Sequence, residues 1–170
     1  MATQIGYSVP EESIGFWQEH FERHKVFYSK PSTKFGELSL AFVDPDGLHL
    51  EIVASQSEAT RKPWATKEVS NEVATRGFHH VTLTLANIEA TVELLTNGFS
   101  YKLMGQEGNR FRLATDAVNQ AAIVDLVELP GVKPGLVAGR SVHHLAFRVK
   151  DQAVQQKFRD QIVARGWSIT

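Results

Sequence analysis

The sequence predicts an α+β fold made of repeated βαβββ units, in which short strands carry helices on one face. Three observations lead to this prediction. One pattern occurs three times, beginning near Thr3, His79 and His143. Each copy opens with a run of alternating apolar and polar residues, which is typical of a half-buried strand. After a short polar break, each copy continues with apolar residues at helical spacing, which indicates an amphipathic helix.

The first unit is expected to span residues 1–55. Its helix follows from Ile14, Trp17 and Phe21, spaced i, i+3 and i+7, and Pro10 suits the start of that helix because a missing N–H costs nothing there. Three strands are then expected over residues 26–29, 37–43 and 48–54. The stretch DPDG separates the last two of them, with proline placed for a tight turn.

The second unit, residues 77–130, repeats this order, with a helical stripe and then strands over 99–104, 110–114 and 121–129. The third copy, 141–170, has a strand from His143, a helix capped by Asp151 and the start of a strand at Trp167. Its pattern stops there, so we expect a truncated third unit, the first half of a further βαβββ module. Linkers are expected at 56–76 and 131–140.

Composition narrows the classes of protein. The 170 residues are 42% hydrophobic and 22% charged with a net charge of −1, which gives no basic field for nucleic acid or an anionic membrane. The apolar runs are too short for a membrane helix and there is no signal peptide, so the cytoplasm is the default location. Without cysteine, a metal site must use histidine, carboxylate or amide oxygen, which suits iron, manganese, nickel or zinc.

Strand alternation selects the candidate site residues. The second histidine of each pair, His80 and His144, should point away from the helix-covered face of its strand. Glu51 and Asp125 occupy matching places in the fourth strands of the first two units. If the two units face each other, these side chains converge on a cleft able to hold a divalent metal. A solvated Glu51 and a simply hydrogen-bonded His80 remain alternatives.

Other polar residues are interpreted more modestly. By the same alternation, His79 and His143 should face a helix and act as structural histidines. Arg110 and Arg112 share a strand face, where they either flank the cleft and hold an anionic substrate or are solvated. The remaining histidines are expected to be exposed rather than functional: His20, His24 and His49.

Taken together, the repeat and the motifs FVDPDGLHLEIV, RGFHHVTLTL and SVHHLAFRV resemble the vicinal oxygen chelate superfamily, which includes glyoxalase, bleomycin-resistance and extradiol dioxygenase proteins. The phrases SVPEESIGFW and GQEGNRFR are most similar to its two-domain ring-cleaving dioxygenases for hydroquinone-type substrates. These contain four such units, and the resemblance places this chain as an internal fragment covering units two, three and half of four. It implies a non-haem iron(II) dioxygenase that takes an aromatic diol and O₂ in aromatic compound degradation.

The resemblance also implies a ligand set of two histidines and one glutamate, of which only His144 falls within this chain. The candidate metal ligands are therefore His144, with His80 and Glu51 as further candidates, and His143 is the candidate acid–base residue. The glyoxalase I branch offers a competing set, namely Gln4, Glu51, His80 and Asp125. Two other functions stay open: a glyoxalase-type metal lyase or isomerase, and a metal-free small-molecule binding module. Homo-oligomerisation is also left open.

One expectation concerns packing. The first two units should form a compact pair through one set of apolar residues, while residues 142–170 should pack poorly. That set is Leu38, Leu40, Phe42, Val81, Leu83 and Phe111.

Overall fold

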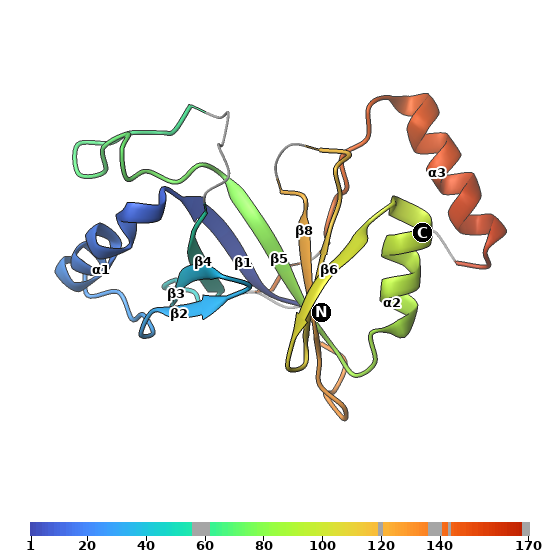
Figure 1. Cartoon of the computed structure of the whole chain (residues 1–170), viewed down its shortest axis with the longest axis horizontal. Coiled ribbons are helices and arrows are strands. Elements are labelled where there is room, and N and C mark those ends of the chain that lie inside the picture. Colours follow the sequence, from blue (N-terminus) through green and yellow to red (C-terminus); the bar gives the residue numbers. More distant parts are fainter. Residues whose placement is uncertain (56–61, 119–120, 136–140, 143, 168–170) are drawn as a thin grey trace.

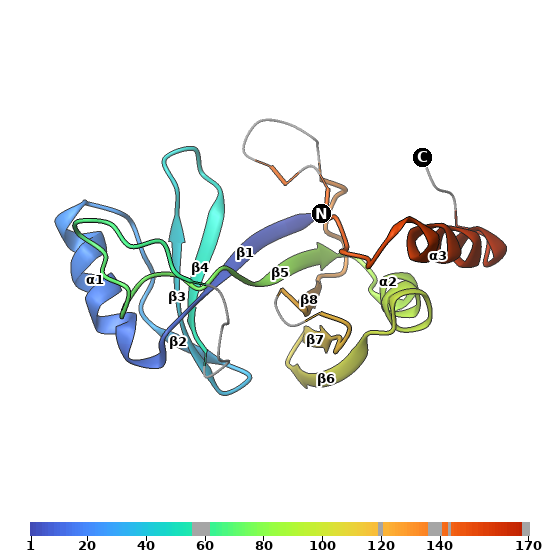
Figure 2. The same ribbon diagram turned by 90° about the horizontal axis from the view of Figure 1, so that it is seen from above.

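The computed structural model describes residues 1–55, 62–118, 121–135, 141–142 and 144–167. Eight strands form one curled mixed sheet in the order β2-β3-β4-β1-β5-β8-β7-β6. Helix α1 lies at one end of the molecule and helices α2 and α3 at the other, with β1 and β5 between them (Figures 1 and 2). The predicted α+β class with paired βαβββ units is confirmed.

The first unit contributes four strands and one helix. Their bounds are β1 Ala2–Val9, α1 Ile14–Arg23, β2 Ser32–Lys34, β3 Glu37–Val43 and β4 His49–Ala54. A short 3-10 turn, Glu11–Ser13, precedes α1 and follows Pro10, where the sequence predicts the helix to start. Strand β4 pairs in parallel with β1 and antiparallel with β3, so β1 lies on the inner side of this half of the sheet.

The second unit repeats the arrangement. Its elements are β5 Phe78–Leu85, α2 Glu89–Glu93 with a π-helical turn Leu94–Gly98, β6 Lys102–Glu107, β7 Arg110–Ala114 and β8 Ile123–Glu128. Strand β8 pairs in parallel with β5, as β4 does with β1. The two first strands, β1 and β5, pair antiparallel and so join the two units into one sheet.

Two predicted strands begin three or more residues later than expected. The stretch 26–29 forms only an isolated bridge between Tyr28 and Phe42, and β2 starts at Ser32. Pro31 separates the two because it has no N–H to donate to the ladder. In the second unit the chain takes a positive φ of 59° at Ser100, so β6 starts at Lys102 rather than at 99.

Each unit has its own apolar core, so the expectation of one apolar set joining the units is wrong. Leu40 and Phe42 pack under α1 in the first core, whereas Val81, Leu83 and Phe111 belong to the second core under α2. Leu38 is 39% exposed. The units are instead joined by the β1–β5 pairing and by the charged residues described below, because the apolar face of each unit is already covered by its own helix.

The third copy forms its helix but not its first strand. Helix α3, Gln152–Ala164, begins as predicted, with the Asp151 side chain accepting a hydrogen bond from the Val154 N–H. Residues 144–149 are irregular, so the predicted strand is wrong for this chain. Strands exist through hydrogen bonds to a neighbour, and none of the eight strands of the sheet pairs with this segment.

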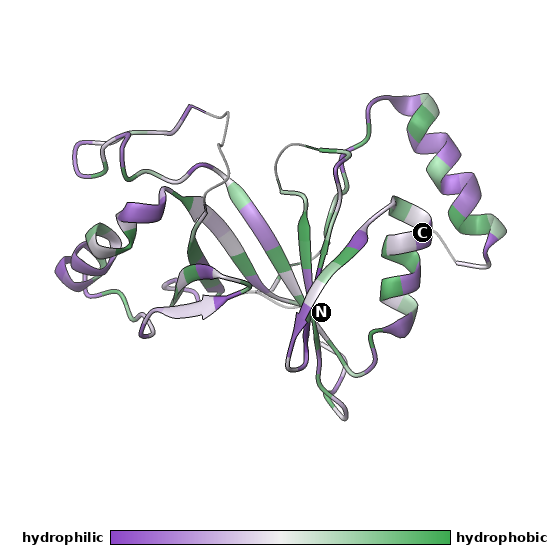
Figure 3. Cartoon of the chain, viewed as in Figure 1, coloured by the Kyte–Doolittle hydropathy of each residue, from purple (hydrophilic) through white to green (hydrophobic). Residues whose placement is uncertain are grey.

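Aromatic stacking holds this segment against the second unit. The rings of Phe147 and Phe158 lie 4.7 Å and 5.8 Å from the ring of Phe99. Helix α3 carries apolar and polar residues in turn, and none of them is buried (Figure 3). For the helix, this agrees with the expectation that residues 142–170 pack poorly.

Among the described residues, no helix is long and apolar enough to cross a membrane.

Candidate functional site: a charged cluster across the joint of two units

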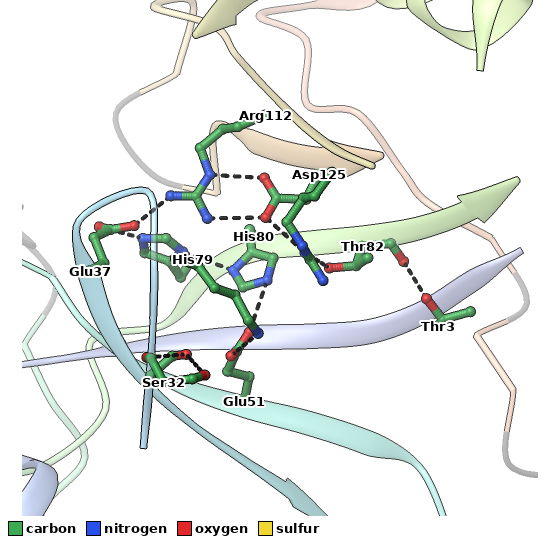
Figure 4. A network of polar contacts seen from close by, with 12 residues as sticks. Thr3, Ser32, Glu37, Glu51, His79, His80, Thr82, Arg112 and Asp125 are labelled. Carbon is green, nitrogen blue, oxygen red and sulfur yellow. Dashed lines mark hydrogen bonds and ion pairs between the residues drawn. The ribbon is translucent and has the colours of Figure 1, made fainter. Parts of the chain in front are cut away.

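Nine polar side chains from six strands meet on one face of the sheet, where the two units join (Figure 4). We call this group the central polar cluster. It consists of Lys34, Glu37, Glu51, His79, His80, Thr82, Arg110, Arg112 and Asp125.

Strand register explains why these residues share a face. Asp125 of β8 lies opposite Thr82 of β5 and opposite Arg112 of β7. Directly opposed residues on paired strands point to the same side of the sheet. The sequence prediction that Glu51 and Asp125 point to the same side as His80 therefore agrees with the structure.

Asp125 is fully buried and both of its oxygens are occupied by arginines. Arg112 donates from Nε to Oδ1 at 2.9 Å and from a terminal nitrogen to Oδ2 at 3.0 Å, which makes a two-point ion pair. Arg110 adds a 3.0 Å bond to Oδ2 and a 3.1 Å bond to the Thr82 hydroxyl. Hydrogen bonds between ionised groups, and two-point arginine–carboxylate pairs above all, are among the strong ones in proteins.

Arg112 also bridges the two units. Its other terminal nitrogen lies 2.5 Å from Oε2 of Glu37, on strand β3 of the first unit, and its guanidinium lies over the Phe35 ring at 4.4 Å. Burial alone would lower the pKa of Arg112, but Asp125 and Glu37 outweigh burial and raise it. Arg112 is only 7% exposed, so the interpretation of a solvated strand face is wrong for this residue.

His79 joins the cluster, contrary to the alternation prediction that it faces a helix. Its Nε2 lies 3.1 Å from Oε1 of Glu37 and its Nδ1 lies 2.9 Å from Nδ1 of His80. The register between β1 and β5 shifts here, since Gly6 pairs with His80 while Tyr7 pairs with Phe78. Such a bulge adds one residue on β5, which breaks strict alternation and lets both histidines reach the same cluster.

Two histidine rings connect Glu37 to Glu51. Because the Glu37 carboxylate only accepts, His79 donates to it from Nε2. The Nδ1 atoms of His79 and His80 lie 2.9 Å apart and share one hydrogen. Nε2 of His80 lies 3.4 Å from Oε2 of Glu51, and neither of these two atoms has a hydrogen-bond partner among the described residues.

The surroundings of Glu51 and His80 shift the pKa values of both side chains. Burial alone would raise the pKa of Glu51, but its contacts with His80 and Lys34 outweigh burial and lower it to about 2. Lys34 supplies the compensating charge, with Nζ 2.5 Å from Oε1. Burial lowers the pKa of His80 despite the neighbouring Glu51, so His80 is neutral at pH 7. Glu51 is fully buried, and its interpretation as a solvated strand residue is wrong.

Gly6 on β1 makes room for the His80 ring. A Cβ at this position would lie 2.3 Å from both Cε1 and Nδ1 of His80, far inside van der Waals contact. The absence of a side chain at Gly6 is therefore a condition for His80 to occupy its place over β1.

The cluster does not fit a metal ion of the glyoxalase kind. Both oxygens of Asp125 are paired with arginines and Oε1 of Glu51 with Lys34, so only Oε2 of Glu51 is left for a metal. His80 and Glu51 offer two ligand atoms, but no third histidine or carboxylate atom joins them in a ligand group among the described residues. Gln4, the remaining member of that proposed set, pairs with Thr82 as a strand neighbour.

The other predicted site residues lie elsewhere. His144 is exposed on the irregular segment before α3 and does not form a three-ligand group with His80 and Glu51. His143 lies outside the described residues, so its acid–base role stays a prediction. The structure thus brings His80 and Glu51 together and leaves His144 apart from them.

The sequence interpretation missed Glu37 and Lys34. Alternation along β3 would have found Glu37, since it shares a face with Ala41, which lies directly opposite Glu51. Lys34 pairs with Glu37 across the β2–β3 hairpin. That strand could not be found from the pattern of the sequence, because β2 is only three residues long and follows a proline.

The fold defines the class of this protein. Two paired βαβββ units build one curled sheet, and helices lie at its ends. Glyoxalase I from Zea mays has the same fold, with a TM-score of 0.51 and 13% identity over 77% of this chain and 44% of that one. No family model matches the sequence. The chain belongs to the vicinal oxygen chelate superfamily.

Within this superfamily, its relatives in sequence are ring-cleaving dioxygenases. It is 35% identical to MhqO of Bacillus subtilis, assigned as a ring-cleaving dioxygenase, over 98% of this chain and 53% of that protein. It is 32% identical to a chlorohydroquinone/hydroquinone 1,2-dioxygenase of Sphingobium indicum, over 96% and 52%. The crystal structure of an assigned dioxygenase from Bacillus subtilis matches all of this chain and 54% of its own, with a TM-score of 0.92 and 31% identity. The chain spans about half the length of the curated relatives it matches.

Proposed function

We propose that this chain is part of a metal-dependent ring-cleaving dioxygenase that acts on hydroquinone-type aromatic diols. The observation that carries the proposal is the identity of 32–35% to two such relatives across nearly the whole chain. Solved structures support it at the level of the backbone, since one assigned dioxygenase superposes with a TM-score of 0.92. The substrates are a small aromatic diol and O₂.

Within this proposal His144 is a ligand of iron(II). When bound, the metal supplies a centre on which a diol and O₂ can be held together. The chain contributes one exposed imidazole on a segment that precedes α3. A single imidazole is a weak site, so the remaining ligands of the proposed set have to come from residues outside the described part of the chain.

The central polar cluster takes a different role in this proposal. Its carboxylates are already paired with Arg110, Arg112 and Lys34, so it joins the two units and holds no metal. This pairing disfavours the glyoxalase-type alternative, which requires Glu51 and Asp125 as metal ligands. The same residues therefore stabilise the scaffold that carries the site, and His80 takes no part in the chemistry.

The test compares two histidine variants in a protein of the relatives' length that contains this chain. Iron content and oxygen uptake with hydroquinone and with catechol are measured for the wild type, His144→Ala and His80→Ala. We expect the wild type to consume oxygen with hydroquinone, His144→Ala to lose both iron and turnover, and His80→Ala to retain iron. The 170-residue chain alone should show no turnover, since it holds only one ligand of the proposed set.

Two outcomes would contradict the proposal. Oxygen uptake by the 170-residue chain would place a complete site inside it. The reverse order of the variants, with iron lost in His80→Ala and kept in His144→Ala, would favour a glyoxalase-like centre at the cluster. Equal iron content in all three proteins would remove both assignments.

A further inference from the structure

A second group of metal-ligating side chains lies far from the central polar cluster, at the outer end of the first unit. His20 lies in the last turn of α1 and His24 is its C-cap residue, four positions later, while Glu68 comes from the segment 62–77 that leads to β5. One ligand atom of each residue lies within 4.8 Å of the others, which no other three histidines or carboxylates achieve among the described residues. The sequence interpretation treated both histidines as exposed and without function.

Spacing on the helix brings the two imidazoles together. Residues four apart on a helix are neighbours on one face, and the ring centroids of His20 and His24 are 4.5 Å apart. His20 also stacks on Phe16 and meets Trp17 edge to face, with centroids at 5.5 Å and 5.6 Å. The first ring is thus held on three sides, which limits its freedom before any ligand binds.

Glu68 is held by the segment that carries it. The Thr66 hydroxyl accepts hydrogen bonds from the N–H groups of Glu68 and Val69, at 3.3 Å and 3.1 Å, and the Thr66 N–H donates to the Val69 carbonyl at 2.8 Å. The same segment is bonded to α1, because the Trp17 indole donates to the Val73 carbonyl at 2.9 Å. The turn therefore faces the helix, and Oε2 of Glu68 lies 2.8 Å from Nε2 of His24.

His20 supplies a further indication. Its Nδ1 is buried and makes no hydrogen bond among the described residues. Buried polar atoms are satisfied in the large majority of cases, so an unsatisfied one calls for a ligand or a water. A metal ion at this ring would not have to displace an existing hydrogen bond of that atom.

We propose that His20, His24 and Glu68 bind one divalent transition-metal ion of the zinc type. Two imidazoles and one carboxylate are a set that zinc accepts, with a water molecule completing four ligands. The ion would link the segment 62–77 to α1 and so fix the connection between the two units. The proposal is independent of the dioxygenase reaction, because His144, the iron ligand proposed above, is not among its three residues.

Calorimetric titration of the chelator-treated 170-residue chain with Zn²⁺ tests the proposal. We expect one ion per chain, and we expect Co²⁺ at the same site to give the visible absorption of a four-coordinate complex. Separate His20→Gln, His24→Gln and Glu68→Gln variants should each weaken binding by about 100-fold or more, beyond the ~10–100-fold typical of residues outside the coordination shell. The matched control is His49→Gln, since His49 is exposed and stands on β4.

A second measurement separates this site from binding elsewhere. Zn²⁺ should slow proteolysis within residues 62–77 in the wild type and in His49→Gln, and it should have no such effect in His24→Gln. Circular dichroism of each variant checks that the fold is retained. If His20→Gln and His24→Gln bind Zn²⁺ as tightly as the wild type, or if His144→Gln alone abolishes binding, the proposal is overturned.

Discussion

Arg112 offers the sharpest test of how the two units are held together. Its guanidinium makes two hydrogen bonds to the fully buried Asp125 and one contact at 2.5 Å to Glu37. Arg112→Met retains much of the side-chain volume but leaves these two carboxylates without their main partner. Removing one member of a buried ion pair costs about 3–5 kcal/mol, because the other charge stays buried without compensation. Arg110 remains 3.0 Å from Asp125, so the lower end of that range, about 3 kcal/mol, is expected.

Urea unfolding followed by circular dichroism measures this loss. With a slope of about 2 kcal/mol per molar urea, the midpoint should fall by about 1.5 M. Lys102→Met is the matched control, since Lys102 pairs with Asp116 at 3.1 Å but both side chains are more than 70% exposed. An exposed pair contributes little, so the control should leave the midpoint nearly unchanged. A fall of less than about 0.5 M for Arg112→Met would refute the view that this residue joins the units.

Three further predictions concern the His80 end of the cluster. In thermal unfolding, Gly6→Ala should lower stability by about 1–3 kcal/mol, because its Cβ would overlap the His80 ring. The control Gly15→Ala adds a Cβ that meets nothing within 4 Å, and it should raise stability by up to about 1 kcal/mol. The pKa of Glu51 is lowered from 4.5 to about 2, so this carboxylate contributes about 3 kcal/mol to the free energy of unfolding above pH 4.5, and that contribution is lost as the pH falls towards 2. The pKa of His80 is also lowered, so a further loss of stability begins as the pH falls below 6.5. Urea midpoints between pH 7 and 3 check this, and a flat profile would contradict it. Lys34→Met should raise the pKa of Glu51 and make the loss below pH 4.5 shallower, and an unchanged slope would exclude Lys34 as the compensating charge.

Local patterns were sufficient for most of the fold. The alternating runs and helical stripes placed β1, α1, β3, β5, β7 and α3 close to their observed bounds, since these elements bury one face and repeat it in the sequence. Errors occurred where chain geometry overrides the pattern. Pro31 delays β2 and the positive φ of Ser100 delays β6. The segment 144–149 has the pattern of a strand, but it pairs with no other strand in the described part of the chain and so remains irregular.

The same division applies to the candidate site. Alternation placed Glu51, His80 and Asp125 on one face, because strand parity is a local property. It gave the wrong face for His79, since a bulge between β1 and β5 depends on how two distant strands are paired. The sequence pattern also could not show that arginines and a lysine pair with these carboxylates, because the partners are distant in the chain: Arg112 and Glu37 are 75 residues apart.

By itself, the sequence determined the repeated βαβββ unit, its class, and the residue types available to a metal. Periodicity and composition are local, and each unit covers its own apolar face with its own helix. Only the tertiary structure decided what the polar face does. Pairing of β1 with β5 brings charges from both units together, and in a buried setting each carboxylate takes the nearest cation, here Arg112 for Asp125 and Lys34 for Glu51. Strand alternation predicted a metal-binding cleft at this place, and in the structure the same residues form ion pairs that join the two units.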